Sequence, residues 1–248
     1  MIGFRVPSKM ITIPFLREYF NRFDFIEVKI SKDENLERIL RYLKRDCLGR
    51  FSIHLPKYTL YNENEYLLTI KIIKLIRKID LYSLNLVTHF YGFNQKMITR
   101  IKMLEEQLPL NSCLSIENVK HTNLIYFEEL DNVMKKLSSD NIGICFDIGH
   151  FLFSCSLIGI SQEKAIEFIK SKKAIMEKIK EYHIHDFNEK QDHLTLVTGN
   201  LNMKLINELI RITGKRIVII ETNVVSPETD GINQVRSVEE LVNESRID

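Results

Sequence analysis

Two hydrophobic periods alternate along the chain. Short apolar runs rich in Ile, Val, Phe and Leu are separated by longer stretches in which apolar residues recur every three or four positions. In 33–45, for example, Leu36, Ile39, Leu40 and Leu43 fall on one helical face. The short runs are typical of buried strands, and the longer stretches are typical of amphipathic helices.

The pattern predicts eight strands, at Ile2–Val6, Phe25–Ile30, Phe51–Leu55, Leu84–Thr88, Cys113–Glu117, Ile142–Phe146, Tyr182–His185 and Ile217–Glu221. It predicts helices at Thr12–Arg22, Asp33–Arg45, Asn64–Ile79, Gln95–Leu108, Tyr126–Leu137, Gln162–Ile179, Met203–Ile212 and Ser237–Asn243. Such alternation favours a parallel sheet with helical crossovers, and its length suits one (β/α)8 TIM barrel domain over residues 1–248. A doubly wound sheet is the alternative, but the first strand is not followed by a glycine-rich phosphate loop.

Most predicted strands end in, or just before, a side chain of a type that binds metal ions. These side chains are His54, His89, Glu117, Asp147, His150, His183, His185, Asp186 and Glu221, with His193 in a later loop. The carboxyl ends of barrel strands converge on one mouth, where barrel enzymes build their active sites. We therefore expect a site at this mouth.

Glu117, Asp147, His183 and Glu221 belong to four successive strands, five to eight. Each alone is consistent with a structural role, such as a capping or turn-forming residue. Together, three clustered carboxylates repel one another unless a cation neutralises them. Carboxylates and imidazoles suit Zn²⁺, Mn²⁺, Mg²⁺ or Co²⁺, so we predict a divalent metal site. Of the two neighbouring histidines we take His183 as the ligand and expect His185 to point away from it.

Charge and composition limit the kinds of partner and the cellular location that we expect. The chain has 35 basic and 33 acidic residues and a net charge of +2, which argues against nucleic acid or an anionic membrane surface as a partner. No apolar run approaches the ~18 residues of a membrane span, and the start lacks the apolar core of a signal peptide, so we expect a cytoplasmic protein. The four scattered cysteines predict buried thiols and no disulfide framework.

These motifs resemble the xylose isomerase-like superfamily of barrels, which includes sugar isomerases and epimerases, inosose dehydratases and isomerases, and endonuclease IV. The resemblance runs from about Phe25 to Glu221. SIEN, FDIGH, HIHD and IIET look like the family's four metal-ligand strands. HLPKY and THFYG are similar to its two earlier histidine strands.

The isomerase branch of the family implies one divalent ion held by Glu117, Asp147, His183 and Glu221. In this branch His150 contacts a substrate oxygen or the ligands. The resemblance also implies that Glu117 and Glu221 are catalytic and move protons on opposite faces of a hydroxy-ketone. Because the family often forms dimers or tetramers, it also implies a homo-oligomer, which the surface pattern does not test.

The endonuclease IV branch implies up to three zinc ions and nine ligands. Eight ligands have matches, namely His54, His89, Glu117, Asp147, His150, His183, His193 and Glu221. The ninth, an aspartate, falls on Gln191, a poor zinc ligand. The DNA-grasping loop expected after the second strand is also missing. Val197 replaces a glycine common to both branches, which leaves the shape of its loop open.

Four functional hypotheses follow. The first is a metal-dependent isomerase or epimerase of a small sugar, polyol or hydroxy-ketone, and the second is a multi-zinc phosphodiesterase acting on abasic DNA. A metal-dependent lyase or hydrolase on the same site and a non-catalytic barrel are the others. Metal stoichiometry separates the first two.

Candidate substrate contacts, each equally consistent with a structural role, are Arg5, Lys9, Glu27, Lys57, Tyr58, Phe90 and Tyr91. The segment after the last strand lacks a glycine-rich phosphate loop, which favours an unphosphorylated substrate.

Overall fold

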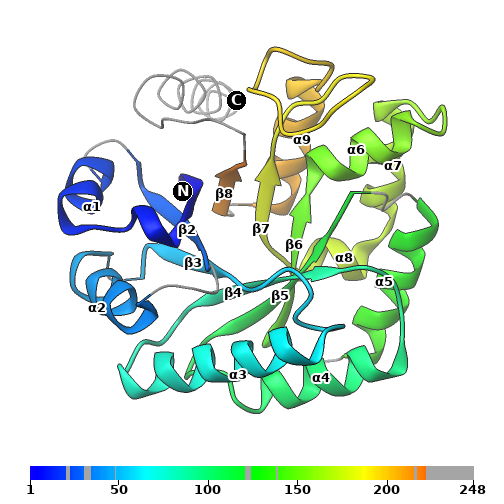
Figure 1. The fold of residues 1–248 in the computed structure, drawn as a ribbon. Helices are drawn as coiled ribbons and strands as arrows, with labels where there is room; N and C mark the ends of the chain where they lie inside the picture. Colours follow the sequence, from blue (N-terminus) through cyan, green and yellow to red (C-terminus); the bar gives the residue numbers. More distant parts are fainter. Residues whose placement is uncertain are drawn as a thin grey trace.

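Eight parallel strands form a closed barrel in sequence order, which confirms the predicted (β/α)8 fold (Figure 1). The computed structural model describes residues 1–20, 23–30, 35–47, 49–120, 124–137, 139–214 and 217–221. The strands are β1 (Ile2–Pro7), β2 (Phe25–Lys29), β3 (Phe51–His54), β4 (Asn85–Phe90), β5 (Cys113–Asn118), β6 (Ile142–Asp147), β7 (Ile179–Ile184) and β8 (Ile217–Ile220).

Helices surround the barrel. They are α1 (Ile13–Phe20), α2 (Leu36–Cys47), α3 (Glu63–Lys78), α4 (Gln95–Glu105), α5 (Leu124–Lys136), α6 (Ile148–Ser156), α7 (Gln162–Ser171), α8 (Lys173–Lys178) and α9 (Met203–Thr213), with a 3-10 turn at Ser8–Met10. The predicted helix Ser237–Asn243 lies outside the described residues. No described helix is long and apolar enough to cross a membrane. All four cysteines are free.

Two helical predictions were wrong. The predicted helix Gln162–Ile179 is two helices that meet at Lys172, whose φ of −90° and ψ of 72° interrupt the helical turn. β7 then begins at Ile179, three residues before the predicted Tyr182. The sequence pattern also missed α6, because nearly all of this helix is buried and it therefore shows no polar face.

Candidate metal centre

Buried side chains from four strands and from Glu221, which directly follows β8, meet on the barrel axis. We call Glu27, Glu117, His183 and Glu221, together with Arg5, the axis group. His183 Nδ1 lies 2.8 Å from Glu117 Oε1 and 3.6 Å from Glu221 Oε2, and its Nε2 lies 3.1 Å from Glu27 Oε2. Ligand atoms of Glu117, Asp147, His183 and Glu221, the predicted ligand set, all lie within 4.8 Å of one another.

His54 and His89 both contact the second oxygen of Glu117. Their Nε2 atoms lie 2.8 and 3.1 Å from Glu117 Oε2. Each Nδ1 instead faces a backbone carbonyl, Leu55 O at 3.0 Å and Lys57 O at 3.2 Å. A carbonyl only accepts, so each Nδ1 is a donor. Because the pKa of His54 is lowered to about 4, its neutral ring turns the lone pair of Nε2 toward the carboxylate. A cation between the rings and Glu117 would relieve this repulsion, and carbonyl-anchored histidines are usual among metal ligands.

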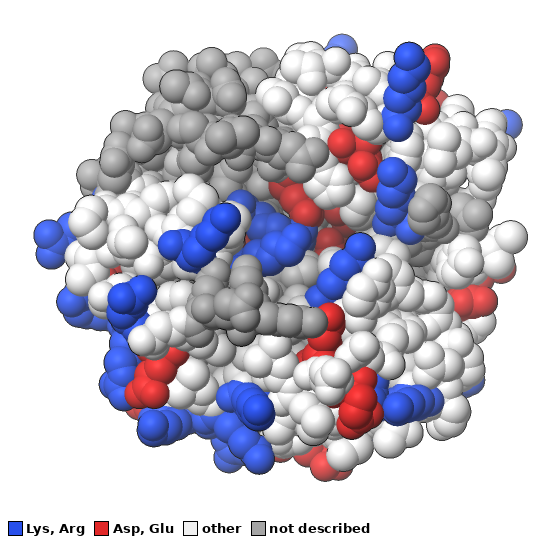
Figure 2. All heavy atoms as spheres, viewed as in Figure 1, with Lys and Arg blue, Asp and Glu red and all other residues white. Residues whose placement is uncertain are grey.

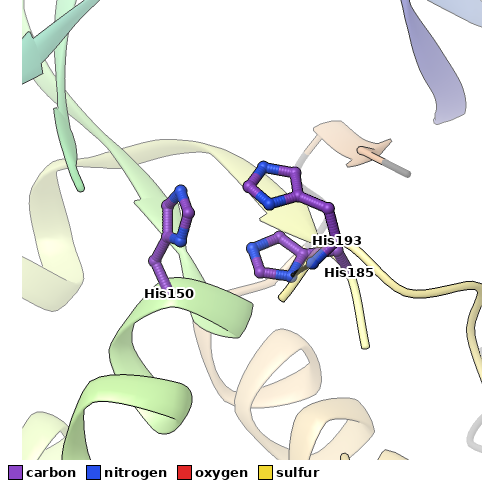
Figure 3. A group of neighbouring side chains, drawn as sticks. All are labelled: His150, His185 and His193. Carbon is purple, nitrogen blue, oxygen red and sulfur yellow. Dashed lines mark hydrogen bonds between the residues drawn. The ribbon is translucent and has the colours of Figure 1, made fainter. Parts of the chain in front are cut away.

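A second cluster lies at the rim of the mouth (Figure 3). We call His150, His185, Asp192 and His193 the loop group. His150 comes from the first turn of α6, His185 directly follows β7, and His193 comes from the loop beyond. The rings of His185 and His193 stack at 4.2 Å, and the His150 ring faces both at 4.8 Å.

Asp147 connects the two groups. Its Oδ1 accepts from the backbone N–H of His150 at 2.7 Å, which caps α6, and lies 3.2 Å from His185 Nε2. Its Oδ2 is buried and makes no hydrogen bond. Of the cluster, Glu221 Oε2, His150 Nδ1 and Asp192 Oδ2 are also buried and make no hydrogen bond, although His150 Nδ1 and Asp192 Oδ2 lie 3.3 Å apart. Buried polar atoms without partners are costly, and this convergence of nitrogen and oxygen donors fits a divalent ion.

The expectation that His185 points away from His183 was wrong. Residues two apart on a strand share a face, and both rings lie fully buried at the mouth. His185 is nevertheless the poorer ligand of the two. Its Nδ1 accepts from the backbone N–H of His193 at 3.0 Å, so the neutral ring directs an Nε2–H toward Asp147.

Asp192, the residue after Gln191, takes the place of the expected aspartate ligand in the cluster. Asp192 lies 3.3 Å from His150 Nδ1 and 3.3 Å from His193 Nδ1. His193 itself has a φ of 58°, a left-handed turn that brings both side chains toward the mouth. No sequence signal marked this turn, since histidine adopts such a φ only occasionally.

Val197 adopts a backbone conformation that suits the missing glycine. Its φ is 68°, which a β-branched residue rarely takes. The loop is held instead by Asp186, whose carboxylate accepts from the backbone N–H groups of Phe187, Gly199 and Leu201 at 2.8 to 2.9 Å. Asp186 therefore supports the loop.

Charge and burial set the protonation of the centre. Burial opposes ionisation of Glu117, but His183, His89 and Arg5 hold its pKa well below the usual range. Burial likewise opposes ionisation of Asp147, and His150 and His185 lower its pKa. Burial and Arg5 together lower the pKa of His54 to about 4. The centre thus presents ionised carboxylates and at least one neutral imidazole.

A cavity of about 370 Å³ opens above these groups. Figure 2 shows lysine and arginine atoms beside a hollow near the middle of this face, with acidic atoms inside it. Its lining residues are Arg5, Lys29, Lys57, His89, Tyr91, Val119, Lys120, His150, Asp192, His193 and Glu221.

Of the predicted substrate contacts, Arg5, Lys57 and Tyr91 line this cavity. Phe90 is buried in the core and Glu27 lies beneath the cavity in the axis group, so neither is a wall residue. Sequence reasoning missed Glu181, which is fully buried and lies 3.4 Å from His183 Nε2. Its signal was a charge within an apolar strand, two residues before His183.

Solved structures similar to this chain include sugar epimerases and a nuclease relative. A D-tagatose 3-epimerase-like protein aligns with a TM-score of 0.68 at 19% identity, covering 98% of this chain and 99% of that chain. An L-ribulose 3-epimerase aligns with a TM-score of 0.66 at 14% identity, covering 99% of this chain and 96% of that chain. An AP endonuclease, family 2, from Brucella melitensis aligns with a TM-score of 0.64 at 14% identity, covering 91% of this chain and 93% of that chain. These identities show a shared fold alone.

A search of curated proteins finds no match. The family model described as xylose isomerase-like TIM barrel matches residues 104–241, more than half of the chain. This segment contains the predicted ligands of β5 to β8. The chain therefore belongs to the xylose isomerase-like TIM barrel family.

Proposed function

We propose that the protein is a divalent-metal-dependent isomerase or epimerase of a small sugar, polyol or hydroxy-ketone. The observation that carries this proposal is the set Glu117, Asp147, His183 and Glu221, clustered at the base of a cavity of about 370 Å³. This volume falls in the range of small-molecule sites. The epimerase names among the similar structures agree with it.

A divalent ion held by these four residues would polarise a carbonyl and acidify the neighbouring C–H. In the proposed reaction, one of Glu117 and Glu221 takes the proton from carbon and the other returns one on the opposite face. His150, on the cavity wall, is positioned to contact a substrate oxygen. Glu117 is almost fully buried, whereas Glu221 lines the cavity.

The cavity lining also favours a charged substrate. Lys29 and Lys57 stand on its wall, where Lys120 lies 3.6 Å from the carboxylate of Asp192 and Glu221 contacts Arg5. A carboxylate on the substrate would satisfy these amines, and it agrees with the absence of a glycine-rich phosphate loop.

Proton exchange tests the reaction directly. Protein loaded with Mn²⁺ or Zn²⁺ is incubated in D₂O with ketoses and keto-acids, and NMR follows loss of the C–H beside the carbonyl. We expect exchange with at least one compound, and a loss of about 10³-fold in Glu117→Gln and Glu221→Gln. The exposed Glu106→Gln at the end of α4 is the control. Wild-type exchange rates in both site variants would contradict the proposal.

A multi-zinc phosphodiesterase is the second candidate. The observation that favours it is the pair of further clusters, His54, His89 and Glu117 on one side and the loop group on the other. Two or three tightly held zinc ions and cleavage of an abasic-site oligonucleotide, with no exchange in any hydroxy-ketone, would replace the first proposal by this one.

A further inference from the structure

Arg5 occupies the centre of the predicted ligand set. Its side chain extends from β1 into the barrel and is buried. Its Nη2 lies 2.7 Å from His183 Nδ1 and 3.3 Å from Glu117 Oε1. Its Nη1 donates to Glu221 Oε1, and its Nε donates to Glu27 Oε1. The guanidinium thus contacts three of the four residues predicted to hold an ion.

The carboxylates around Arg5 explain why its guanidinium lies at the centre of the ligand set. Five buried carboxylates, Glu27, Glu117, Asp147, Glu181 and Glu221, surround the axis and its rim. Burial alone would lower the pKa of Arg5, but Glu27 and Glu117 raise it, so the guanidinium keeps its charge. A buried carboxylate without a counter-charge is strongly destabilising, and a planar fork of donors suits several carboxylates at once.

The contacts differ between the two groups of the mouth. Arg5 contacts none of His150, His185, Asp192 and His193, and these residues leave buried polar atoms without hydrogen bonds. The axis group therefore already has a buried cation between its carboxylates, whereas Asp192 of the loop group pairs with Lys120, whose Nζ lies 3.6 Å from Asp192 Oδ2 and whose side chain is 41% exposed.

We propose that Arg5 is the internal counter-ion of the axis group and competes with the divalent ion for it. Ion binding requires the guanidinium to release Glu117, His183 and Glu221, whereas its pair with Glu27, which is outside the ligand set, can persist. Arg5 consequently keeps the metal-free barrel folded and weakens ion binding at the axis group alone. This inference rests on the proposed metal dependence, but it concerns affinity and stability and not turnover.

The test compares Arg5→Met with Lys29→Met. Lys29 lines the same cavity and makes no ion pair with the four ligand residues, so it controls for the general loss of one positive charge. Chelator-treated proteins are titrated with Mn²⁺ and with Zn²⁺ by calorimetry. We expect Arg5→Met to bind the ion at least 10-fold more tightly than wild type and Lys29→Met to change affinity by less than 3-fold.

Thermal unfolding supplies a second readout. Metal-free Arg5→Met should melt below metal-free wild type, and the difference should vanish when the ion is bound. Unchanged or weaker ion affinity in Arg5→Met would overturn the proposal, since Arg5 would then support the ligands instead of competing for them.

Chemical rescue keeps the proposal testable if the Arg5 variants do not fold without metal. In Arg5→Ala refolded with metal, millimolar guanidinium should lower ion affinity, whereas wild type should not respond. No response in Arg5→Ala would contradict competition. If the protein binds the ion but catalyses no proton exchange, the proposed function fails and the role of Arg5 stands. If neither wild type nor any variant binds an ion, both the proposed function and the role of Arg5 are overturned.

Discussion

The axis group and the loop group differ in how their charges are balanced. In the axis group, Glu27 of β2, Glu117 of β5 and Glu221 beyond β8 surround His183 and Arg5, and most of their polar atoms are paired. In the loop group, His150 Nδ1 and Asp192 Oδ2 lie 3.3 Å apart and Lys120 Nζ lies 3.6 Å from Asp192 Oδ2, yet neither buried atom of His150 and Asp192 makes a hydrogen bond. The comparison suggests that strands supply a centre stable without metal, whereas the rim completes its coordination only with an added ion or substrate.

Asp147→Asn should have the largest effect, because Asp147 borders both groups. Asparagine caps a helix as well as aspartate does, so α6 should persist. We expect metal affinity to fall at least about 100-fold, in line with loss of a charged ligand, with unfolding temperature nearly unchanged. Calorimetric titration measures the affinity.

Asp131→Asn is the matched control, since Asp131 is a buried aspartate paired with Lys135 away from the mouth. Equal metal affinity in Asp147→Asn and Asp131→Asn would contradict a role for Asp147 in binding the ion.

Acid titration should separate His54, which contacts Glu117 of the axis group, from His150 of the loop group, because the two histidines change stability with pH in opposite directions. The pKa of His54 falls from 6.5 to about 4 on folding, so the unfolded chain binds more protons in this window. Stability of the metal-free protein should therefore decrease as pH falls from 6.5 to 4, by up to about 3 kcal/mol from His54. His54→Gln should flatten this slope in urea unfolding.

His150 should act in the opposite direction. Burial lowers its pKa, but Asp147 and Asp192 raise it above 6.5 overall. Its stabilisation is present below pH 6.5 and is lost as pH rises through the folded pKa. His150→Gln should remove this decline above pH 6.5 and leave the acidic slope intact. Identical profiles for His54→Gln and His150→Gln would contradict the assignment.

Gly149→Ala should disturb the loop group and spare the axis group. A Cβ at Gly149 would lie 2.5 to 2.7 Å from ring atoms of His185, and that ring accepts a bond from the backbone of His193. We expect a loss of about 1 to 3 kcal/mol of stability, despite the better helix propensity of alanine. Denaturant unfolding measures it.

Ser156→Ala, at the other end of α6, controls for alanine in this helix. If Gly149→Ala altered ion affinity at the axis group as strongly as Asp147→Asn does, the two groups would not be separable.

Val197→Gly should have the smallest effect. Val197 is 66% exposed, so little packing is lost, and glycine accepts its φ of 68° without strain. We expect a stabilisation of up to about 1 kcal/mol, because the relieved strain exceeds the extra entropy of glycine in the unfolded chain. Val197→Ala, which keeps the Cβ, should gain less in thermal unfolding. A destabilised Val197→Gly would show that the turn is not strained.

The four strand-end residues named from the sequence lie together in the structure, and their role as metal ligands stays a prediction. Glu117 and Asp147 could be placed because the carboxyl ends of parallel strands meet at one mouth. The alternation rule, applied two residues along, would also have placed His185 beside His183. The sequence did not indicate which charged side chains would form ion pairs with one another. Arg5 lies opposite Glu27 in the β1–β2 register, yet its reach to Glu221 exists only in the closed barrel.

The rim could not be predicted to the same extent. Asp192 joins the site through the left-handed turn at His193, which depends on tertiary contacts of the loop. The helix α6 was hidden because its apolar residues face the core on all sides.

Metal content per chain tests the central claim most directly. Protein purified without added metal, and protein exposed to Mn²⁺ or Zn²⁺, is measured by elemental mass spectrometry beside Glu117→Gln and His193→Ala. We predict at least one ion per chain in wild type, retained in His193→Ala and lost in Glu117→Gln. Absence of any ion from wild type after exposure to both metals would contradict a metal centre at this mouth.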